Sequence, residues 1–109
     1  MTMVEGYRTR LRPGAAEEYR RVHARIPDAV ASALRECGLI SWRIWIDGDT
    51  LFHAIETATG REEMVALMTA RGPVDPAWDA LIATLVDDTE GAALSLEPVW
   101  ALTSGPREP

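Results

Sequence analysis

The chain of 109 residues contains one cysteine, Cys37, and no lysine. A single cysteine excludes an intramolecular disulfide, and a zinc site would have to be built from the two histidines and carboxylates. Because Cys37 ends a helical series of apolar residues, we expect it to be a buried small hydrophobe and not a nucleophile. All eleven basic residues are arginine, so a Schiff-base mechanism on a lysine side chain is excluded.

The chain also lacks an excess of basic charge and a long apolar run. Its formal net charge of -6 argues against a nucleic-acid partner, which would need a basic surface. Charged residues interrupt the first twelve positions, where a signal peptide would need an uninterrupted apolar segment, and no membrane span is evident. We therefore expect a cytoplasmic protein. The length and the hydrophobic fraction of 47% predict one globular domain, residues 1–109.

The first half of the chain is predicted to form a strand, a helical segment and a hairpin. Apolar spacing changes from alternation to a helical period and back again. Proline cannot continue a helix, so a kink or break is expected in the helical segment near Arg25 to Pro27. Gly48-Asp49 is typical of a two-residue hairpin turn. The expected elements are a strand at Met3–Leu11, a helical segment from about Ala15 to Cys37, and strands at Leu39–Asp47 and Thr50–Thr57.

The second half is predicted to be helical before it ends in a strand. We expect Thr59 to cap a helix that runs to about Ala70, and a further helix from about Asp75 to Val86. A last strand is predicted over Leu94–Leu102, followed by a flexible tail at residues 104–109. The order βαββαβ with antiparallel pairing predicts an α+β, ferredoxin-like sandwich, with a four-stranded sheet and helices on one face.

The hairpin turn also predicts which side chains share a face of the sheet. If Gly48-Asp49 is the whole turn, then Trp45 pairs with Phe52, Ile44 with His53, and Trp42 with Ile55. We assign the face that carries Trp42 and His53 to the helices. The opposite face, with Trp45 and Phe52, is too apolar to remain in water, so we expect it to be covered in a homodimer.

A polar pair on the first helical segment predicts a pocket. Tyr19 and His23 are four residues apart on the apolar face, so both should point inward. A phenol and an imidazole on a buried face need partners, which a polar small-molecule pocket would supply. Taken alone, His23 is more simply a core histidine with a satisfied hydrogen bond.

The chain resembles the L-rhamnose mutarotase family in four segments: EEYRRVHARI, GLISWRIWIDGDTLFHAIE, PVDPAWDALIATLVD and EPVWAL. The resemblance extends from about Tyr7 to Leu102. It implies a ferredoxin-like fold in a dimeric α+β barrel, with His23 as the proton donor and Tyr19 as a substrate-binding residue. This chain has Trp42 where the family often has tyrosine, and Ala77-Trp78 where bacterial members can carry two tryptophans.

Mutarotation of a free aldose fits these residues. The reaction opens the hemiacetal ring, rotates the aldehyde and closes the ring again, which needs a proton delivered to the ring oxygen and another removed from the anomeric hydroxyl. A histidine with a pKa of about 6.5 has both protonation states available near neutral pH. We predict His23 as the catalytic group and Tyr19, Trp42, His53 and Trp78 as residues that bind a monosaccharide. No metal or other cofactor is expected.

Two other functions remain open, because one fold supports many reactions. The same architecture occurs in cofactor-independent monooxygenases and cyclases that act on aromatic polyketides, and a tryptophan-lined pocket suits a flat apolar ligand. A non-catalytic binding module is the other alternative. The role of His53 also stays open between a second acid-base group, a hydrogen-bond anchor for a sugar hydroxyl, and a structural strand residue. Trp42 and Trp78 are alternatively core residues.

Overall fold

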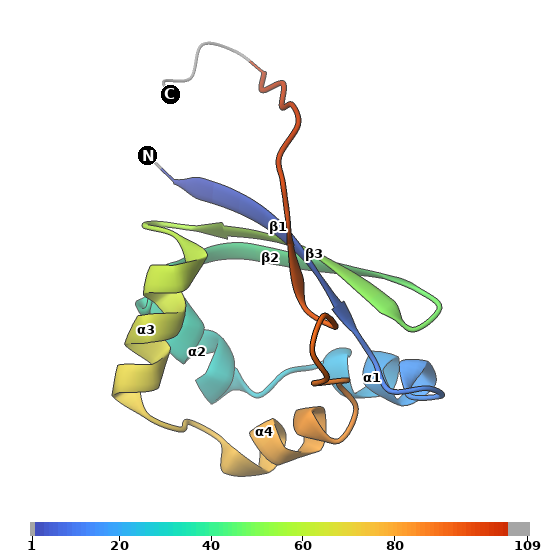
Figure 1. Ribbon diagram of the computed structural model, residues 1–109. Helices are drawn as coiled ribbons and strands as arrows, with labels where there is room; N and C mark the ends of the chain where they lie inside the picture. The colour runs from blue at the N-terminus through green and yellow to red at the C-terminus, as the bar shows by residue number, and fades with distance from the viewer. Residues whose placement is uncertain (1, 105–109) are drawn as a thin grey trace.

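The computed structural model describes residues 2–104, so the predicted tail beyond Ser104 lies outside the described residues. Within these residues, four strands and four short helices follow one another (Figure 1). They are β1 (Met3–Arg10), α1 (Ala16–His23), α2 (Asp28–Glu36), β2 (Leu39–Asp47), β3 (Thr50–Thr57), α3 (Arg61–Arg71), α4 (Pro76–Ala83) and β4 (Leu94–Leu96).

The four strands form one antiparallel sheet with the order β2-β3-β1-β4. The helices lie on one side of it, and the other side has no helix over it among the described residues (Figure 1). The predicted fold class, a ferredoxin-like α+β sandwich with a four-stranded antiparallel sheet and helices on one face, is therefore confirmed. In the βαββαβ order, the place of the second helix, between β3 and β4, is taken by two helices, α3 and α4.

The predicted hairpin register is confirmed. Trp45 pairs with Phe52 and Ile44 with His53, and Asp47 pairs with Thr50 beside the turn. Gly48 has a φ of 62°, a left-handed conformation that glycine adopts without a steric penalty. The register places His53 on the helix side, where it is buried, and leaves Trp45 on the opposite side, where it is exposed.

The predicted break in the first helical segment is also confirmed. Helix α1 ends at His23 and α2 begins at Asp28, with Pro27 in an extended conformation as the residue before its first turn. Proline lacks the N–H that a continuous helix would need at this point. The break ends α1 directly after His23 and separates it from α2.

The predicted cap of the third helix is wrong. Gly60, not Thr59, precedes α3, and no side chain at this position caps the helix. The first N–H groups are instead satisfied from other parts of the chain: Thr57 Oγ1 accepts from the N–H of Gly60 at 2.8 Å, and Glu5 Oε2 from that of Arg61 at 2.7 Å. An acidic side chain at a helix N-terminus is also stabilised by the helix dipole.

The last strand is shorter than predicted. It pairs with β1 only over Leu94–Leu96, and the chain from Glu97 onward leaves the sheet (Figure 1). Three large apolar side chains in this segment are largely exposed, with Val99 at 95%, Trp100 at 79% and Leu102 at 80%. An apolar strand pattern therefore extends well beyond the residues that pair in a single copy of the chain.

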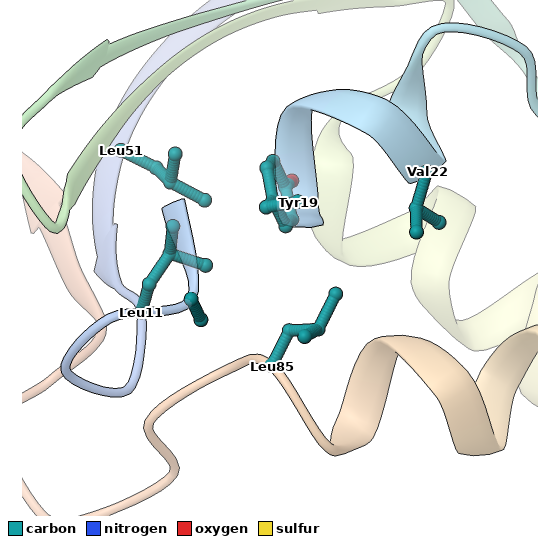
Figure 2. Packing of buried hydrophobic residues seen from close by; sticks show 6 residues of the cluster. Leu11, Tyr19, Val22, Leu51 and Leu85 are labelled. Carbon is teal, nitrogen blue, oxygen red and sulfur yellow. The ribbon is translucent and has the colours of Figure 1, made fainter. Parts of the chain in front are cut away.

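The buried side chains form two clusters between the helices and the sheet. One joins Leu11, Tyr19, Val22, Leu51 and Leu85, which converge from α1, β3 and the segments next to β1 and α4 (Figure 2). The other joins Tyr7, Cys37, Ile55 and Met64. Cys37 is a buried free thiol, as the sequence predicted. None of the helices within residues 2–104 is both long and apolar enough to span a membrane.

Candidate functional site

All five side chains that the sequence singled out line one cavity. Tyr19, His23, Trp42, His53 and Trp78 surround a space of about 1130 Å³, whose walls come from all four helices and the first three strands. A smaller space of about 460 Å³ shares Tyr7, Trp42 and Arg61 with it. The cavity lies between the helical layer and the sheet, so one wall is helical and the other is the inner face of the sheet.

Tyr19 and His23 form the helical wall. They are one turn apart on α1, and their rings stack with centroids 4.1 Å apart at an angle of 22°. Burial raises the pKa of Tyr19 to about 12, with a smaller contribution from Tyr7, so its phenol stays protonated near neutral pH. The hydroxyl can therefore donate a hydrogen bond to a ligand as well as accept one.

His23 is half-buried and lacks a hydrogen bond at one ring nitrogen. Its Nδ1 atom is buried without a partner among the described residues. Burial lowers the pKa of His23 below its ordinary value of 6.5, so the neutral imidazole predominates near neutral pH. Buried polar atoms are rarely left unpaired, and those that are often belong to functional sites. The Nδ1 atom of His23 is thus available to a ligand as a hydrogen-bonding partner.

Trp78 closes the cavity beside His23. The two rings are tilted by 52°, with centroids 5.4 Å apart. Trp78 is placed by the start of α4, where Asp75 Oδ1 accepts its backbone N–H at 3.0 Å and Pro76 supplies a favourable first residue. The cap fixes the turn of helix that carries the indole, so Trp78 restrains the imidazole from one side.

His53 lies on the sheet wall and has a partner at each ring nitrogen. Trp42 Nε1 donates to its Nδ1 at 3.2 Å, and its Nε2 lies 2.8 Å from Thr9 Oγ1. Its ring also stacks on that of Tyr7, with centroids 4.2 Å apart and the planes within 6°. These contacts use side chains from three adjacent strands, β2, β3 and β1.

The surroundings of His53 keep it neutral. Burial is the main reason that its pKa falls to about 4, and the charge of Arg61 lowers it further, with a smaller contribution from His23. The guanidinium carbon of Arg61 lies 4.1 Å from the centre of the Tyr7 ring, a cation–π arrangement. At neutral pH the sheet wall therefore presents an uncharged imidazole with both nitrogens engaged.

Tyr7, Thr9 and Arg61 were not predicted as site residues. Tyr7 and Thr9 are two residues apart, so they share one face of β1. That they reach the cavity follows only from the pairing of β1 with β3, which places Tyr7 opposite His53. Arg61 follows Gly60 at the start of α3, where nothing local indicates a pocket. Within the described part of the chain, no group of three His, Cys, Asp or Glu side chains is arranged to hold a metal ion.

Comparisons with known proteins agree with one another. The model of the L-rhamnose mutarotase family matches residues 5–103. An L-rhamnose mutarotase from Burkholderia ambifaria is 35% identical over 88% of this chain and 94% of its own length. One from Sinorhizobium fredii is 33% identical over 89% and 95%. The crystal structure of an L-rhamnose mutarotase from Formosa agariphila superimposes with a TM-score of 0.71 over 93% of this chain and 99% of that one. At 19% identity, this last match establishes a shared fold.

Proposed function

The chain belongs to the L-rhamnose mutarotase family, and we propose that it is an isomerase that interconverts the α and β anomers of L-rhamnose or a related aldose. The observation that carries the proposal is the convergence of Tyr19, His23, Trp42, His53 and Trp78 on one cavity. A space of this size accommodates a monosaccharide, and tryptophans beside polar groups are typical of sites that stack on the apolar face of a sugar ring.

In this mechanism His23 moves the protons. The neutral imidazole removes the proton of the anomeric hydroxyl, and the protonated imidazole supplies a proton to the ring oxygen as the bond between the anomeric carbon and that oxygen breaks. The products of this step are the open-chain aldehyde and a neutral histidine. Rotation of the aldehyde and the reverse proton transfers close the ring in the other anomer. A pKa below 6.5 suits this cycle, because the histidine begins as a base.

The other residues hold the sugar in this proposal. Tyr19, whose phenol stays protonated, donates a hydrogen bond to a sugar hydroxyl one helical turn from His23. Trp78 stacks on the sugar from the helical wall, and Trp42 from the sheet wall. Positioned acid-base groups of this kind contribute roughly 10²- to 10⁴-fold to a rate, which is sufficient for a reaction that already proceeds in water.

Saturation-transfer NMR on equilibrating sugars tests the proposal. L-rhamnose, L-fucose and other free aldoses are each mixed with the protein, and the exchange rate between anomers is compared with that in buffer. We expect L-rhamnose or a close relative to exchange faster, with Ser32→Ala, on the exposed side of α2, behaving as the wild type. If no sugar exchanges faster, the mutarotase proposal is wrong. Binding shifts without exchange would then indicate a binding module. The family match does not favour the monooxygenase or cyclase alternative.

We further propose that the protein is a homodimer through the outer face of the sheet. Along one line across all four strands lie Trp45, Phe52, Arg8 and Leu94, and the apolar members of this line are exposed in the single chain. Trp45 alone is 55% exposed. A second copy would cover this face, and it would also shelter the apolar residues after β4. The dimer would have about twice the 12.0 kDa mass of the chain.

Light scattering at micromolar concentration tests the dimer. We expect Trp45→Glu to dissociate the dimer or to make it aggregate, because a carboxylate would be desolvated in the interface. Ser32→Glu adds the same charge on the exposed side of α2 and should leave the mass unchanged. A wild-type mass near that of one chain would contradict the proposal.

We also propose that the protein acts in the cytoplasm. A cytoplasmic location is compatible with the buried thiol of Cys37, which would stay reduced there. Cell fractionation with an antibody to the native chain tests this placement.

A further inference from the structure

We infer that His53 is a positioning residue: it accepts the indole N–H of Trp42, donates to Thr9, and thereby holds the Trp42 ring as an apolar platform in the cavity. The kinetic part of this inference rests on the proposed mutarotase function, whereas the structural part does not. It gives one role to a histidine for which the sequence left three roles open.

The hydrogen bonds fix the tautomer of His53. An indole nitrogen can only donate, so the Nδ1 atom that accepts from Trp42 must lack a proton. In the neutral ring the proton is then on Nε2, which donates to Thr9 Oγ1 at 2.8 Å. Both nitrogens are committed. Protonation of Nδ1 would turn two N–H groups toward each other and break the bond to Trp42, so proton exchange at this ring conflicts with its contacts.

The position of the imidazole is fixed by the sheet. His53 is paired with Ile44 on β2 and with Tyr7 on β1, so it lies in the middle of three strands. Only 7% of its surface is exposed, and the Tyr7 ring covers one face of it. A side chain packed in this way is a stiff hydrogen-bond acceptor, as positioning of a neighbouring group requires.

The consequence falls on Trp42. Its side chain is 37% exposed, it lines both cavities, and its one polar atom is bonded to His53. The part of Trp42 left for a ligand is therefore its apolar ring. At this position the protein would recognise the C–H face of a sugar by stacking, and a hydroxyl directed at the ring edge would find no free donor.

Three substitutions of His53 separate the two hydrogen bonds. The amide of asparagine lies at the position of Nδ1, so His53→Asn retains an acceptor for Trp42. The amide of glutamine reaches the position of Nε2, so His53→Gln retains the contact with Thr9 and loses the acceptor. His53→Ala removes both. The indole N–H resonance of Trp42, identified by its loss in Trp42→Phe, reports on the bond directly. Long-range proton–nitrogen NMR spectra report on the tautomer.

We expect the Nε2–H tautomer in the wild type, and a hydrogen-bonded, slowly exchanging Trp42 N–H in the wild type and in His53→Asn. In His53→Gln and His53→Ala this N–H should exchange faster and move toward the position of a free indole. In the same two variants KM should rise roughly two- to tenfold, the value of one aromatic contact, with kcat nearly unchanged. His53→Asn should restore KM.

Three results would overturn the inference. One is the Nδ1–H tautomer. Another is a Trp42 resonance that does not move in His53→Gln and His53→Ala. The third is a loss of kcat in His53→Asn as large as that in His23→Ala, which would make His53 an acid-base group. If no form of the protein accelerates anomer exchange, the proposed function fails while the NMR spectra still decide the hydrogen bond. Should the variants of His53 not fold, Thr9→Val keeps the side-chain shape and leaves the indole donor in place, so the Nε2–H tautomer and the hydrogen-bonded Trp42 N–H are the expected result there. A change to the Nδ1–H tautomer in Thr9→Val would mean that Thr9, and not Trp42, sets the tautomer, and would count against the inference.

Discussion

The two histidines of the chain line the same cavity from opposite walls, and they differ in their partners. His23 is carried by α1, stacks on Tyr19 and lies beside the tilted ring of Trp78, and its buried Nδ1 atom has no hydrogen bond in the described structure. His53 is carried by β3 and has Trp42 at one nitrogen and Thr9 at the other. The histidine on the helical wall therefore has a ring nitrogen without a hydrogen bond, whereas both ring nitrogens of the histidine on the sheet wall have a partner.

This difference shows that a shifted pKa does not by itself identify a proton-transfer group. Burial lowers the pKa of both imidazoles, and the larger shift belongs to His53, the one with the more complete set of contacts. What distinguishes the two rings is whether a proton can be gained or lost without breaking a bond that the fold already makes. By that criterion we infer that His23 is the imidazole available for proton transfer and that His53 has a positioning role.

Of the changes that test this difference between the two histidines, removal of His23 should have the largest effect on the rate of anomer exchange. We expect His23→Ala to slow anomer exchange by roughly 10²- to 10⁴-fold, because it removes the group that transfers both protons. The fold should survive, since Tyr19 and Val22 hold this part of α1 in the core and water can occupy the space that the imidazole leaves. Saturation-transfer NMR measures the rate, and circular dichroism checks the fold. A folded His23→Ala variant with near-wild-type exchange would refute the proposed mechanism.

Acidification should have the next largest effect on the exchange rate, because it protonates His23. If His23 begins as a base, kcat/KM should be level near and above pH 6.5 and fall about tenfold per pH unit below its lowered pKa. Exchange rates measured from pH 8 to pH 4, with the acid-catalysed reaction of the buffer subtracted, give this profile. His53→Asn should show the same acidic limb, because His53 does not transfer the proton. If the acidic limb disappears in His53→Asn, His53 and not His23 would be the group that transfers the proton, and the proposed mechanism would be wrong.

The parts of this site that could be predicted depend on local sequence. The four-residue spacing of Tyr19 and His23 places both on one face of a helix, and Pro27 ends that helix segment nearby. Gly48-Asp49 sets the hairpin register, which places Trp42 and His53 on the helix side of the sheet. In each case a short stretch of chain determines the geometry.

The parts that could not be predicted depend on pairing between distant segments. Tyr7 and Thr9 meet His53 only because β1 pairs with β3, and Glu5 caps α3 only because α3 begins beside β1. Neither relation leaves a signal within one window of sequence. The end of β4 at Leu96 was missed for a related reason, since the apolar pattern continues to Leu102 while the pairing with β1 stops.

Removal of the Tyr19 hydroxyl should have a smaller effect than either change at His23. Tyr19→Phe keeps the ring that stacks on His23 and loses one hydrogen bond, which is worth about 1 kcal/mol, or roughly a fivefold change in binding. We expect this change mainly in KM, with kcat within a factor of two or three. The KM and kcat values for the sugar that exchanges fastest measure the split. A loss confined to kcat would instead show that the phenol acts on the reacting atoms.

The smallest expected effect concerns stability, and it tests the neutral state of His53. The pKa of this residue is about 4 in the folded chain and near 6.5 when the chain is unfolded, so between these values the unfolded chain binds more protons. The free energy of unfolding should therefore decrease as pH falls from 6.5 toward 4 and should be independent of this group above pH 7. Carboxylates also titrate near the acidic end, so the informative quantity is the difference from a variant without the imidazole.

Thermal unfolding at pH 7 and pH 5 should show a decrease in Tm that is a few degrees smaller in His53→Gln than in the wild type. Equal decreases in the two proteins would mean that His53 keeps an ordinary pKa in the folded chain, and the contrast between the two walls would then have to rest on the hydrogen bonds alone.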